Sequence, residues 1–217
     1  MNSVVIVAGG KGLRMGYNIP KQFILLKNKP ILMHTIEKFH NWDPNCEIVL
    51  VLPKSQHDYW NSICLKQQFN IPLKITNGGE TRFHSVKNGL NKTTGTTIGI
   101  HDGVRPFVTS ETISLCFNTA RKKGNAIPCI PVNDSLRIEE NNTNKMVDRS
   151  LFFRIQTPQV FQSDVIKKAF NQPFSENFTD DASVIESDGK SVNLVMGNEE
   201  NIKITRPVDL KIALALI

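Results

Sequence analysis

Cysteine is scarce in this sequence, and the way it is spaced excludes two kinds of structure. The four cysteines have no C-x-x-C spacing and no histidines clustered beside them: Cys46, Cys64, Cys116 and Cys129. A zinc site or a disulfide framework is therefore not expected, and we predict reduced, half-buried thiols. Apolar runs of the roughly 20 residues needed to cross a bilayer are also missing. Because Met1 leads almost directly into an apolar stretch, we expect neither a signal peptide nor a transmembrane helix, and hence a cytoplasmic protein.

Runs of basic residues are missing as well. The 26 Lys and Arg exceed the 20 Asp and Glu, giving a formal net charge of +6, but they never form a run of five. This charge favours anionic partners, and phosphorylated small molecules explain it as well as nucleic acid does. No basic motif interleaved with aromatic residues is present, so we expect no nucleic-acid partner.

Two common phosphate-binding motifs and two common hydrolase motifs are absent. The dinucleotide fingerprint G-x-G-x-x-G fails because Met15 stands where the third glycine is needed. The G-x-x-x-x-G-K-[ST] loop fails because Gly16 is followed by Tyr17. The G-x-S-x-G nucleophile turn and the H-E-x-x-H zinc helix do not occur either.

The most informative stretch is MNSVVIVAGGKGLRMG at the start of the chain, with PKQF at positions 20–23. Residues 3–8 form a valine-rich apolar run, which predicts a strand buried on both faces of a parallel sheet. Glycines follow this run at once, and cations surround the predicted turn: Gly9, Gly10 and Gly12, then Lys11, Arg14 and Lys21. Glycines let the backbone N–H groups approach an anion, so the stretch indicates a phosphate-binding loop. An ordinary strand-to-helix turn with surface cations is the alternative.

Strand and helix patterns alternate along most of the chain. Strands are predicted at 3–8, 47–52, 73–76, 97–100, 126–132 and 191–196, and helices at 30–39, 56–69, after the Gly-Gly turn in 77–86, and at 163–170, 179–187 and 207–217. Prolines in 126–132 favour an edge strand or a bend, and Thr179 is predicted as a helix N-cap. The alternation predicts an α/β fold, a doubly wound three-layer α/β/α sandwich formed by one domain over residues 1–217.

The fourth predicted strand delivers His101 and Asp102 at its tip. A carboxylate at the carboxyl end of a parallel strand lies where open α/β sheets bind ligands, and beside a triphosphate it suits Mg²⁺. A turn cap is the alternative role for Asp102. Arg105, three residues further on, favours an anion and metal site instead.

Residues 133–157 break the alternation of strands and helices. The segments SLRI and KMV can pair as a hairpin across the polar turn EENNTN, which predicts a projecting β-arm. Its apolar residues, particularly Leu151, Phe152 and Phe153, would be poorly covered on a lone hairpin. We therefore predict that a second subunit packs there and that the arm is a dimerisation element.

Several separated motifs together point to one family. AGGKGLRMG, PKQF, GGETR with its SV, HDGVRPF, PVNDS, VDRS, QTPQVF, TDDAS and NIKITRPVDL stand in this order along the chain. Over nearly its whole length the chain resembles the 2-C-methyl-D-erythritol 4-phosphate cytidylyltransferase family. The resemblance implies a Rossmann-like nucleotidyltransferase fold, CTP and a polyol phosphate as substrates, Mg²⁺ or another divalent cation, and a homodimer with active sites shared between subunits.

The same resemblance implies roles for individual residues. Catalytic contacts to the triphosphate fall on Arg14, Lys21 and Lys203. Nucleotide contacts fall on Ala8, Gly9, Gly10 and Gly12 around CTP, on Gly79 and Ser85 beside the cytosine, and on Asp102, which would hold Mg²⁺ and the ribose side. Contacts to the acceptor phosphate fall on Arg105 and Thr179 and, from the partner subunit, on Ser135 and Arg149.

At two positions the residues differ from those that are most common in the family. Ser135 stands where threonine is frequent and keeps the hydroxyl, while Gly103-Val104 replaces a pair of alanines. The second departure resembles ribitol-5-phosphate cytidylyltransferases, so ribitol 5-phosphate remains an alternative acceptor. VDRS and TDDAS fit the methylerythritol enzymes better. A nucleotide-sensing protein without catalysis is a further alternative, although it would not need Asp102, Arg105 and Lys203 together.

Overall fold

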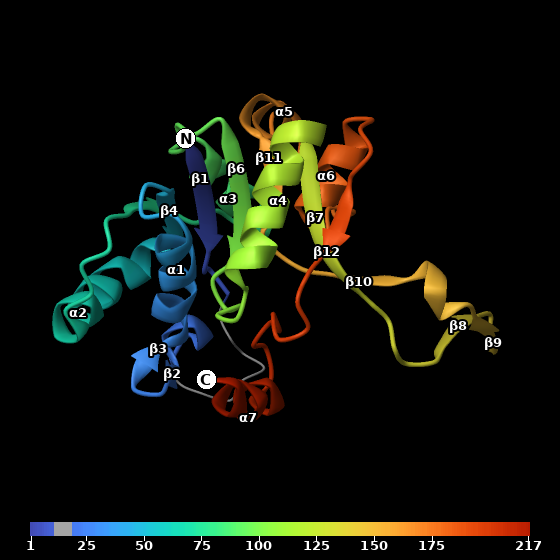
Figure 1. The fold of residues 1–217 in the computed structure, drawn as a ribbon, viewed down its shortest axis with the longest axis horizontal. Helices are drawn as coiled ribbons and strands as arrows, with labels where there is room; N and C mark the ends of the chain where they lie inside the picture. Colours follow the sequence, from blue (N-terminus) through green and yellow to red (C-terminus); the bar gives the residue numbers. More distant parts are fainter. Residues whose placement is uncertain (11–18) are drawn as a thin grey trace.

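The computed structural model describes residues 1–10 and 19–217, and its centre is one mixed β-sheet (Figure 1). The strand order is β10-β7-β11-β6-β1-β4-β5, and β12 pairs with β7 on its other side. The strands of this sheet are β1 (Asn2–Val7), β4 (Glu47–Leu52), β5 (Lys74–Asn77), β6 (Thr97–Asp102), β7 (Asn125–Pro131), β10 (Phe153–Ile155), β11 (Gln159–Gln162) and β12 (Leu194–Met196).

Four neighbouring strands, β5, β4, β1 and β6, run parallel. Val5 of β1 lies opposite Val49 on one side and Ile100 on the other, so β1 is hydrogen-bonded along both edges. Parallel strands end at the same edge of a sheet, and this brings the segments after Val7, Leu52, Asn77 and Asp102 together.

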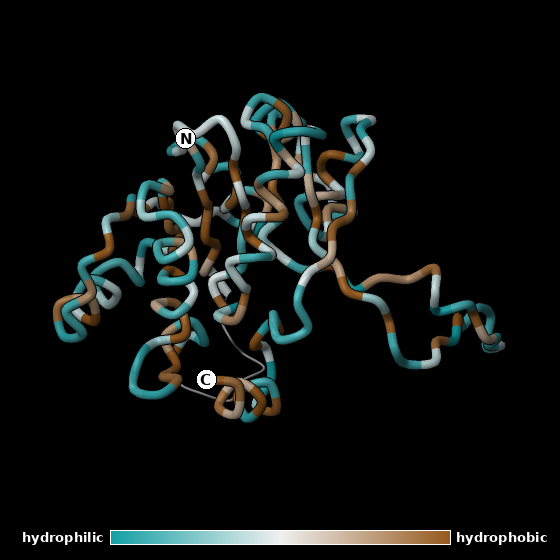
Figure 2. The backbone as a smooth tube through the Cα atoms, viewed as in Figure 1, coloured by the Kyte–Doolittle hydropathy of each residue, from teal (hydrophilic) through white to brown (hydrophobic). Residues whose placement is uncertain are grey.

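Helices cover both faces of the sheet. On one face lie α1 (Ile31–Trp42), α2 (His57–Gln67) and α4 (Ser110–Lys123); on the other lie α3 (Arg82–Leu90), α5 (Ser163–Ala169) and α6 (Asp181–Ser187). Within β1, Ile6 packs with the first group of helices and Val5 with the second, which is the alternation expected of a strand covered on both sides. In Figure 2 this central strand is largely hydrophobic. The predicted three-layer α/β/α fold is confirmed.

The terminal helix α7 (Pro207–Leu216) lies apart from these two layers (Figure 1). It packs with the small sheet of β2 (Leu25–Leu26) and β3 (Lys29–Pro30), through a separate cluster that includes Ile31, Val104 and Ile204. Within the ranges 1–10 and 19–217, no helix has the length and apolar character needed to cross a membrane.

Two of the sequence expectations are wrong in detail. Residues 126–132 do not form an edge strand, because β7 pairs with β10 and β11 on one side and with β12 on the other. Pro128 is tolerated there because its carbonyl accepts from Gln156, so its missing N–H faces the bend between β10 and β11. Thr179 is not the N-cap of α6: Asp180 caps it, accepting from the N–H of Ser183 at 2.9 Å.

The cysteines are free, and three of them are buried rather than half-buried: Cys46, Cys116 and Cys129. Burial raises the pKa of the Cys46 thiol to about 12 and that of Cys116 to about 12. Thiols with such raised pKa values are poor nucleophiles and behave as small hydrophobic residues.

The predicted hairpin is present and projects from the rest of the molecule (Figure 1). Strands β8 (Leu136–Glu140) and β9 (Thr143–Val147) pair antiparallel across Asn141 and Asn142, both with positive φ. Asparagine tolerates this conformation better than most residues, which explains a tight two-residue turn. Several apolar side chains of the arm are exposed: Ile138, Met146, Leu151, Phe152, Phe153 and Ile155.

Candidate active site

A cavity of about 460 Å³ opens at the carboxyl ends of the parallel strands. Its walls contain eight of the residues predicted from the sequence: Ala8, Gly9, Gly10, Lys21, Gly79, Ser85, Asp102 and Lys203. These residues come from segments spread over almost the entire chain, and the fold brings them to one place. Gly12 and Arg14, together with Lys11, lie outside the described residues.

A second glycine turn, after β5, forms one wall of the cavity. The Gly79 N–H donates to the hydroxyl of Ser85 at 3.0 Å, so the two residues predicted beside the cytosine are in contact with each other. A Cβ added at Gly79 would lie 2.4 Å from Cβ of His84, which explains why only glycine fits there. The turn therefore brings main-chain groups close to the cavity with no side chain in between.

Lys21 lies over the first glycine turn. A Cβ added at Gly10 would come within 3.2 Å of Cε of Lys21, so the two residues are in close contact. The next residue, Gln22, is fully buried, and its amide donates to the carbonyl of Ala8 and to the side chain of Gln56, both at 2.7 Å. Gln22 therefore ties the short 3₁₀ helix Lys21–Phe23 to the end of β1 and helps to place Lys21. Gln22 stands inside the motif PKQF but was not among the predicted site residues.

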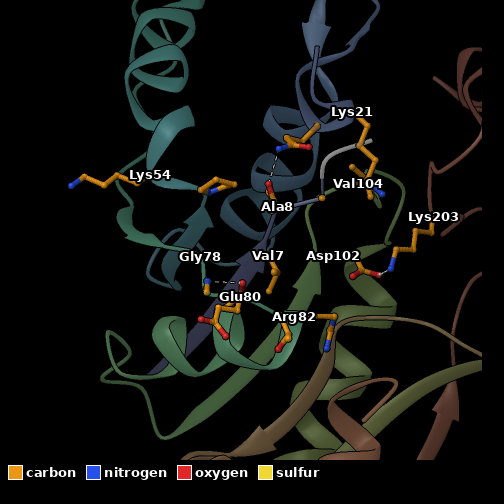
Figure 3. Close-up of a pocket in the computed structure, with 17 residues that line it drawn as sticks. Val7, Ala8, Lys21, Lys54, Gly78, Glu80, Arg82, Asp102, Val104 and Lys203 are labelled. Atoms are coloured by element: carbon orange, nitrogen blue, oxygen red, sulfur yellow. Dashed lines mark hydrogen bonds and ion pairs between the residues drawn. The ribbon is translucent and has the colours of Figure 1, made fainter. Parts of the chain in front are cut away.

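Asp102 is a carboxylate surrounded by cationic side chains in the cavity. Its Oδ2 atom accepts from Nε of Arg105 at 3.0 Å. The same atom lies 3.1 Å from Nζ of Lys203, and Figure 3 shows this pair. Burial would raise the pKa of Asp102, but the positive charges of Lys203, Arg82 and Arg105 outweigh it and hold that pKa well below its usual range. The carboxylate is thus ionised and ready to bind cations at neutral pH.

His101 is a buried, neutral ring that is connected to Asp102 through Thr157. Burial lowers the pKa of His101 to about 4. Thr157 accepts from the N–H of Asp102 at 3.1 Å, and its hydroxyl lies 3.0 Å from Nδ1 of His101. The hydroxyl therefore donates to Nδ1, and Nε2–H donates to the carbonyl of Arg105 at 3.1 Å. This chain of hydrogen bonds holds Asp102 and Arg105 in place.

Lys203 comes from an irregular segment between β12 and α7, and Asn201 fixes that segment. Asn201 is fully buried; its side chain donates to the carbonyl of Thr157 at 2.8 Å, and its own carbonyl accepts from Arg105 at 2.7 Å. The segment is thereby attached to the bend between β10 and β11, where Thr157 also supports Asp102. Lys203 consequently reaches Asp102 from a fixed backbone, although no helix or strand carries it.

Arg82 is a further cation in the cavity wall that the sequence reasoning missed. It begins α3 and forms two hydrogen bonds with the carboxylate of Asp181, at 2.8 and 2.6 Å. In Figure 3, Arg82 and Lys203 lie on different sides of Asp102. The motifs GGETR and TDDAS each contain one partner of this ion pair, but nothing in either motif indicates that the two residues meet.

The remaining predicted residues do not line the cavity of their own chain. Arg105 lies behind Asp102, and Thr179 is exposed just before α6. Ser135 and Arg149 lie in the projecting arm, where the Arg149 side chain donates to the carbonyl of Asn133. The cavity of one chain therefore contains most of the residues predicted to contact the nucleotide, but neither of the two residues predicted from the arm.

A divalent cation fits this site only together with a phosphorylated ligand. No cluster of three or more His, Cys, Asp or Glu side chains with metal-binding geometry occurs in residues 1–10 and 19–217. Mg²⁺ commonly binds through one or two carboxylates and the substrate's own phosphates, and one ionised carboxylate in a cationic cavity matches that arrangement. Asp102 is the residue that would hold it.

Comparisons with known proteins agree with this geometry. The model of the 2-C-methyl-D-erythritol 4-phosphate cytidylyltransferase family matches residues 2–217. A protein of that name from Bacteroides fragilis is 51% identical over 216 residues, covering 99% of each chain. The crystal structure of 4-diphosphocytidyl-2C-methyl-D-erythritol synthase from Anaerococcus prevotii is similar, with a TM-score of 0.85, 28% identity and coverage of 99% of this chain and 95% of that one. A 2-C-methyl-D-erythritol 4-phosphate cytidylyltransferase from Thermus thermophilus gives a TM-score of 0.80 at 28% identity, with 99% and 97% coverage. The chain therefore belongs to the 2-C-methyl-D-erythritol 4-phosphate cytidylyltransferase family.

Proposed function

We propose that this protein transfers a cytidylyl group from CTP to 2-C-methyl-D-erythritol 4-phosphate, with pyrophosphate as the second product. The observation that carries the proposal is the cavity between two glycine turns, in which the buried Asp102 carboxylate is held by Lys203 and Arg105. This is the environment that a nucleoside triphosphate and a divalent cation need. Family membership supplies the identity of the two substrates.

In the proposed reaction an oxygen of the acceptor phosphate attacks the α-phosphorus of CTP in line, and the bond from that phosphorus to pyrophosphate breaks. No covalent intermediate with the protein is required, and a phosphate monoester is already largely ionised near neutral pH. The protein must bring two anions together and stabilise the charge that develops on the α-phosphate and on the leaving group. A bound Mg²⁺ would supply part of that neutralisation.

The positive charges of this chain supply the rest. Lys21 lies over the first glycine turn and Lys203 lies at Asp102, so the two lysines reach the cavity from separate segments. We assign both, with Arg14, to the triphosphate. Ala8, Gly9, Gly10 and Gly12 surround the nucleotide, while Gly79 and Ser85 face the cytosine in a slot too narrow for a purine. Arg105 and Thr179 belong to the acceptor side.

The test of this function is a screen for pyrophosphate release. It crosses ATP, GTP, CTP and UTP with methylerythritol phosphate and ribitol phosphate. We expect release with CTP and methylerythritol phosphate only. Comparable turnover with a purine nucleotide would contradict the proposed slot, and equal use of UTP would show that the exocyclic amine of cytosine is not recognised.

Ribitol 5-phosphate is the second acceptor in that screen because Gly103-Val104 stands where alanines are usual in the family. The relatives do not favour it, since those about half identical to this chain carry the methylerythritol name. Preferred turnover of ribitol phosphate would overturn the assignment of the acceptor but not that of the reaction. CTP binding with no pyrophosphate release from either acceptor would leave a nucleotide-binding protein without catalysis.

We also propose that the active protein is a homodimer whose arm, residues 133–157, completes the site of the other subunit. Ser135 and Arg149 would then meet the acceptor phosphate in trans. Two features support this: the arm projects away from the central sheet and its helices (Figure 1), and it exposes large apolar side chains, with Leu151 at 75% and Met146 at 70%. An exposed apolar surface of this kind is typical of a subunit interface.

The shared site can be tested by mixing two inactive variants, Lys21→Ala and Arg149→Ala, under conditions in which subunits exchange. A mixed dimer with sites shared in trans has one site with both defects and one site with none. Random pairing makes half of the dimers mixed, so activity should return to roughly one quarter of wild type. No recovery despite demonstrated exchange would contradict the shared site, and a monomer in sedimentation would contradict the dimer.

A further inference from the structure

The ion pair between Arg82 and Asp181 joins α3, whose first residue lines the cavity, to α6, which follows the predicted acceptor residue Thr179. Arg82 is the first residue of α3, which follows the glycine turn assigned to the cytosine. Asp181 is the first residue of α6, two residues after Thr179 on the acceptor side. Both terminal nitrogens of Arg82 are used: Nη1 donates to Oδ1 at 2.8 Å and Nη2 to Oδ2 at 2.6 Å.

Stability alone does not explain a charged pair at this place. The Asp181 side chain is 1% exposed and that of Arg82 is 32% exposed. Removing such charges from water costs free energy that their attraction only partly returns, and apolar side chains of similar size often serve stability equally well. A bidentate pair does, however, fix distance and orientation better than apolar contacts do. Its position in the cavity wall therefore points to a geometric role.

Other contacts hold the same two segments together. Phe83, the residue after Arg82, packs against Phe178 at 5.5 Å and Phe174 at 5.9 Å between ring centroids. Both phenylalanines lie in the loop that leads to Thr179. Gln159 of β11 donates to Asp180 at 2.7 Å and accepts from the N–H of Ala182 at 2.8 Å, so the start of α6 is also attached to the sheet.

Thr179 itself has no part in capping the helix. Because Asp180 is the N-cap, the Thr179 hydroxyl is not used for that purpose, and the residue is exposed immediately before the ion-paired turn. Its position relative to the nucleotide side therefore depends on how α6 is attached to α3. Arg82 makes that attachment from inside the cavity wall, within electrostatic reach of Asp102.

We propose that Arg82 is a positioning residue which, through its bidentate pair with Asp181, sets the distance between the acceptor side and the nucleotide side of the site. The inference rests on the proposed cytidylyl transfer. Arg82 acts through Asp181, because each of its terminal nitrogens donates to one oxygen of that carboxylate. Correct placement of the acceptor phosphate against the α-phosphate requires this link, since small errors in the position of two reactants are costly.

The test compares Arg82→Lys, Asp181→Asn and the double variant with wild type. Lysine keeps the charge of Arg82 but cannot form the two parallel hydrogen bonds. We expect each single variant to raise KM for methylerythritol phosphate roughly tenfold while changing KM for CTP less than about twofold. The double variant should be no worse than the worse single one, as for two residues that act through one contact. Arg121→Lys, at an exposed arginine of α4, is the matched control and should change neither constant.

A second measurement does not depend on turnover. Hydrogen exchange in the presence of CTP should be faster for the amides of residues 179–183 in Arg82→Lys than in wild type, and unchanged for residues 78–80. Failure of wild type to release pyrophosphate would refute the proposed function, whereas this exchange result would still support the link between α3 and α6. An unchanged KM for the acceptor, equal increases in both KM values, additive losses in the double variant, or unchanged exchange at 179–183 would each overturn the role of Arg82.

Discussion

A carboxylate paired with a lysine lies at each end of the parallel strands, and only the pair at their carboxyl ends lies at the candidate site. Asp102 ends β6 and pairs with Lys203 at 3.1 Å, while Glu47 begins β4 and pairs with Lys74 at 2.5 Å. Their side chains are 9% and 11% exposed. Burial would raise both pKa values, yet their partners lower that of Glu47 to about 2 and hold that of Asp102 below its usual range.

The partners distinguish the two carboxylates. The oxygens of Glu47 accept from Lys74, from the Ser3 hydroxyl at 2.5 Å and from the N–H and hydroxyl of Thr94 at 2.8 and 3.1 Å. They are satisfied by one charge and by neutral donors from β1 and from the loop before β6. Asp102 instead pairs with Lys203 and Arg105 at a cavity that Lys21 and Lys54 also line, so positive charge exceeds negative charge there. A surplus of cations around one carboxylate indicates a site that can bind an anion. A structural ion pair in which the charges balance gives no such indication.

Removing the lysine of each pair should give the largest contrast. We predict that Lys203→Ala lowers turnover with CTP and methylerythritol phosphate by roughly 100-fold or more, with a smaller change in KM for CTP. Lys21→Ala should behave in the same way, since both charges are needed most in the transition state. Lys74→Ala should leave turnover within about twofold of wild type, because Lys74 lies at the opposite end of the parallel strands. Steady-state kinetics of the three variants provide the measurement.

An effect of Lys203→Ala confined to KM for CTP would reduce Lys203 to ground-state binding. A loss of turnover in Lys74→Ala as large as that in Lys203→Ala would remove the distinction between the two ends. Circular dichroism of each variant serves as the control for folding.

Neutralising the two carboxylates, Asp102 and Glu47, should have different effects on the dependence of activity on Mg²⁺. Asp102→Asn removes the negative charge that we propose holds Mg²⁺. The Mg²⁺ concentration for half-maximal activity should therefore rise by roughly tenfold or more. Glu47→Gln makes the same chemical change away from the cavity and should leave the metal titration unchanged. An unchanged titration in Asp102→Asn would exclude Asp102 from the metal site.

The smallest effect concerns acid stability. A carboxyl whose pKa is lowered on folding stabilises the protein above its unfolded pKa, near 4.5 for Glu47, and loses this contribution as the pH falls towards about 2. We predict that Glu47→Gln lowers the melting temperature at pH 7 by roughly 2–5 °C, since partial exposure reduces the contribution of the pair. The difference from wild type should shrink between pH 4.5 and pH 2. Glu139→Gln, on the exposed hairpin, is the control for loss of one negative charge, and a difference that stays constant over this pH range would contradict the prediction.

The sequence reasoning predicted the strands near the cavity well because their signals are local. The apolar run of β1, the glycines that end it and Asp102 at the tip of β6 all lie in short continuous segments. The helix α4 was not predicted, although Thr109 before it and apolar residues at Ile113, Cys116, Phe117 and Ala120 have helical spacing. Its N-cap, where Thr109 accepts from the N–H of Thr112, was the missed signal.

Contacts between segments far apart in the chain could not be predicted from the sequence. Arg82 and Asp181 are 99 residues apart, and no pattern in one sequence indicates that they meet. The interior position of β7 likewise depends on β12, which joins it from far along the chain. Local preference correctly marks Pro128 as unsuited to a regular ladder, but the bend opposite it is a property of the assembled sheet.

We propose that the acceptor phosphate is joined to the α-phosphate of CTP in the cavity at Asp102. Phosphorus-31 NMR of wild-type protein with CTP, Mg²⁺ and methylerythritol phosphate tests this directly, because a new diphosphate link couples two phosphorus nuclei that were separate before. We expect two new, mutually coupled resonances that grow together with one equivalent of pyrophosphate, and no such new pair in Lys203→Ala over the same time. Release of pyrophosphate with CMP, and no coupled pair, would show transfer to water and contradict the account.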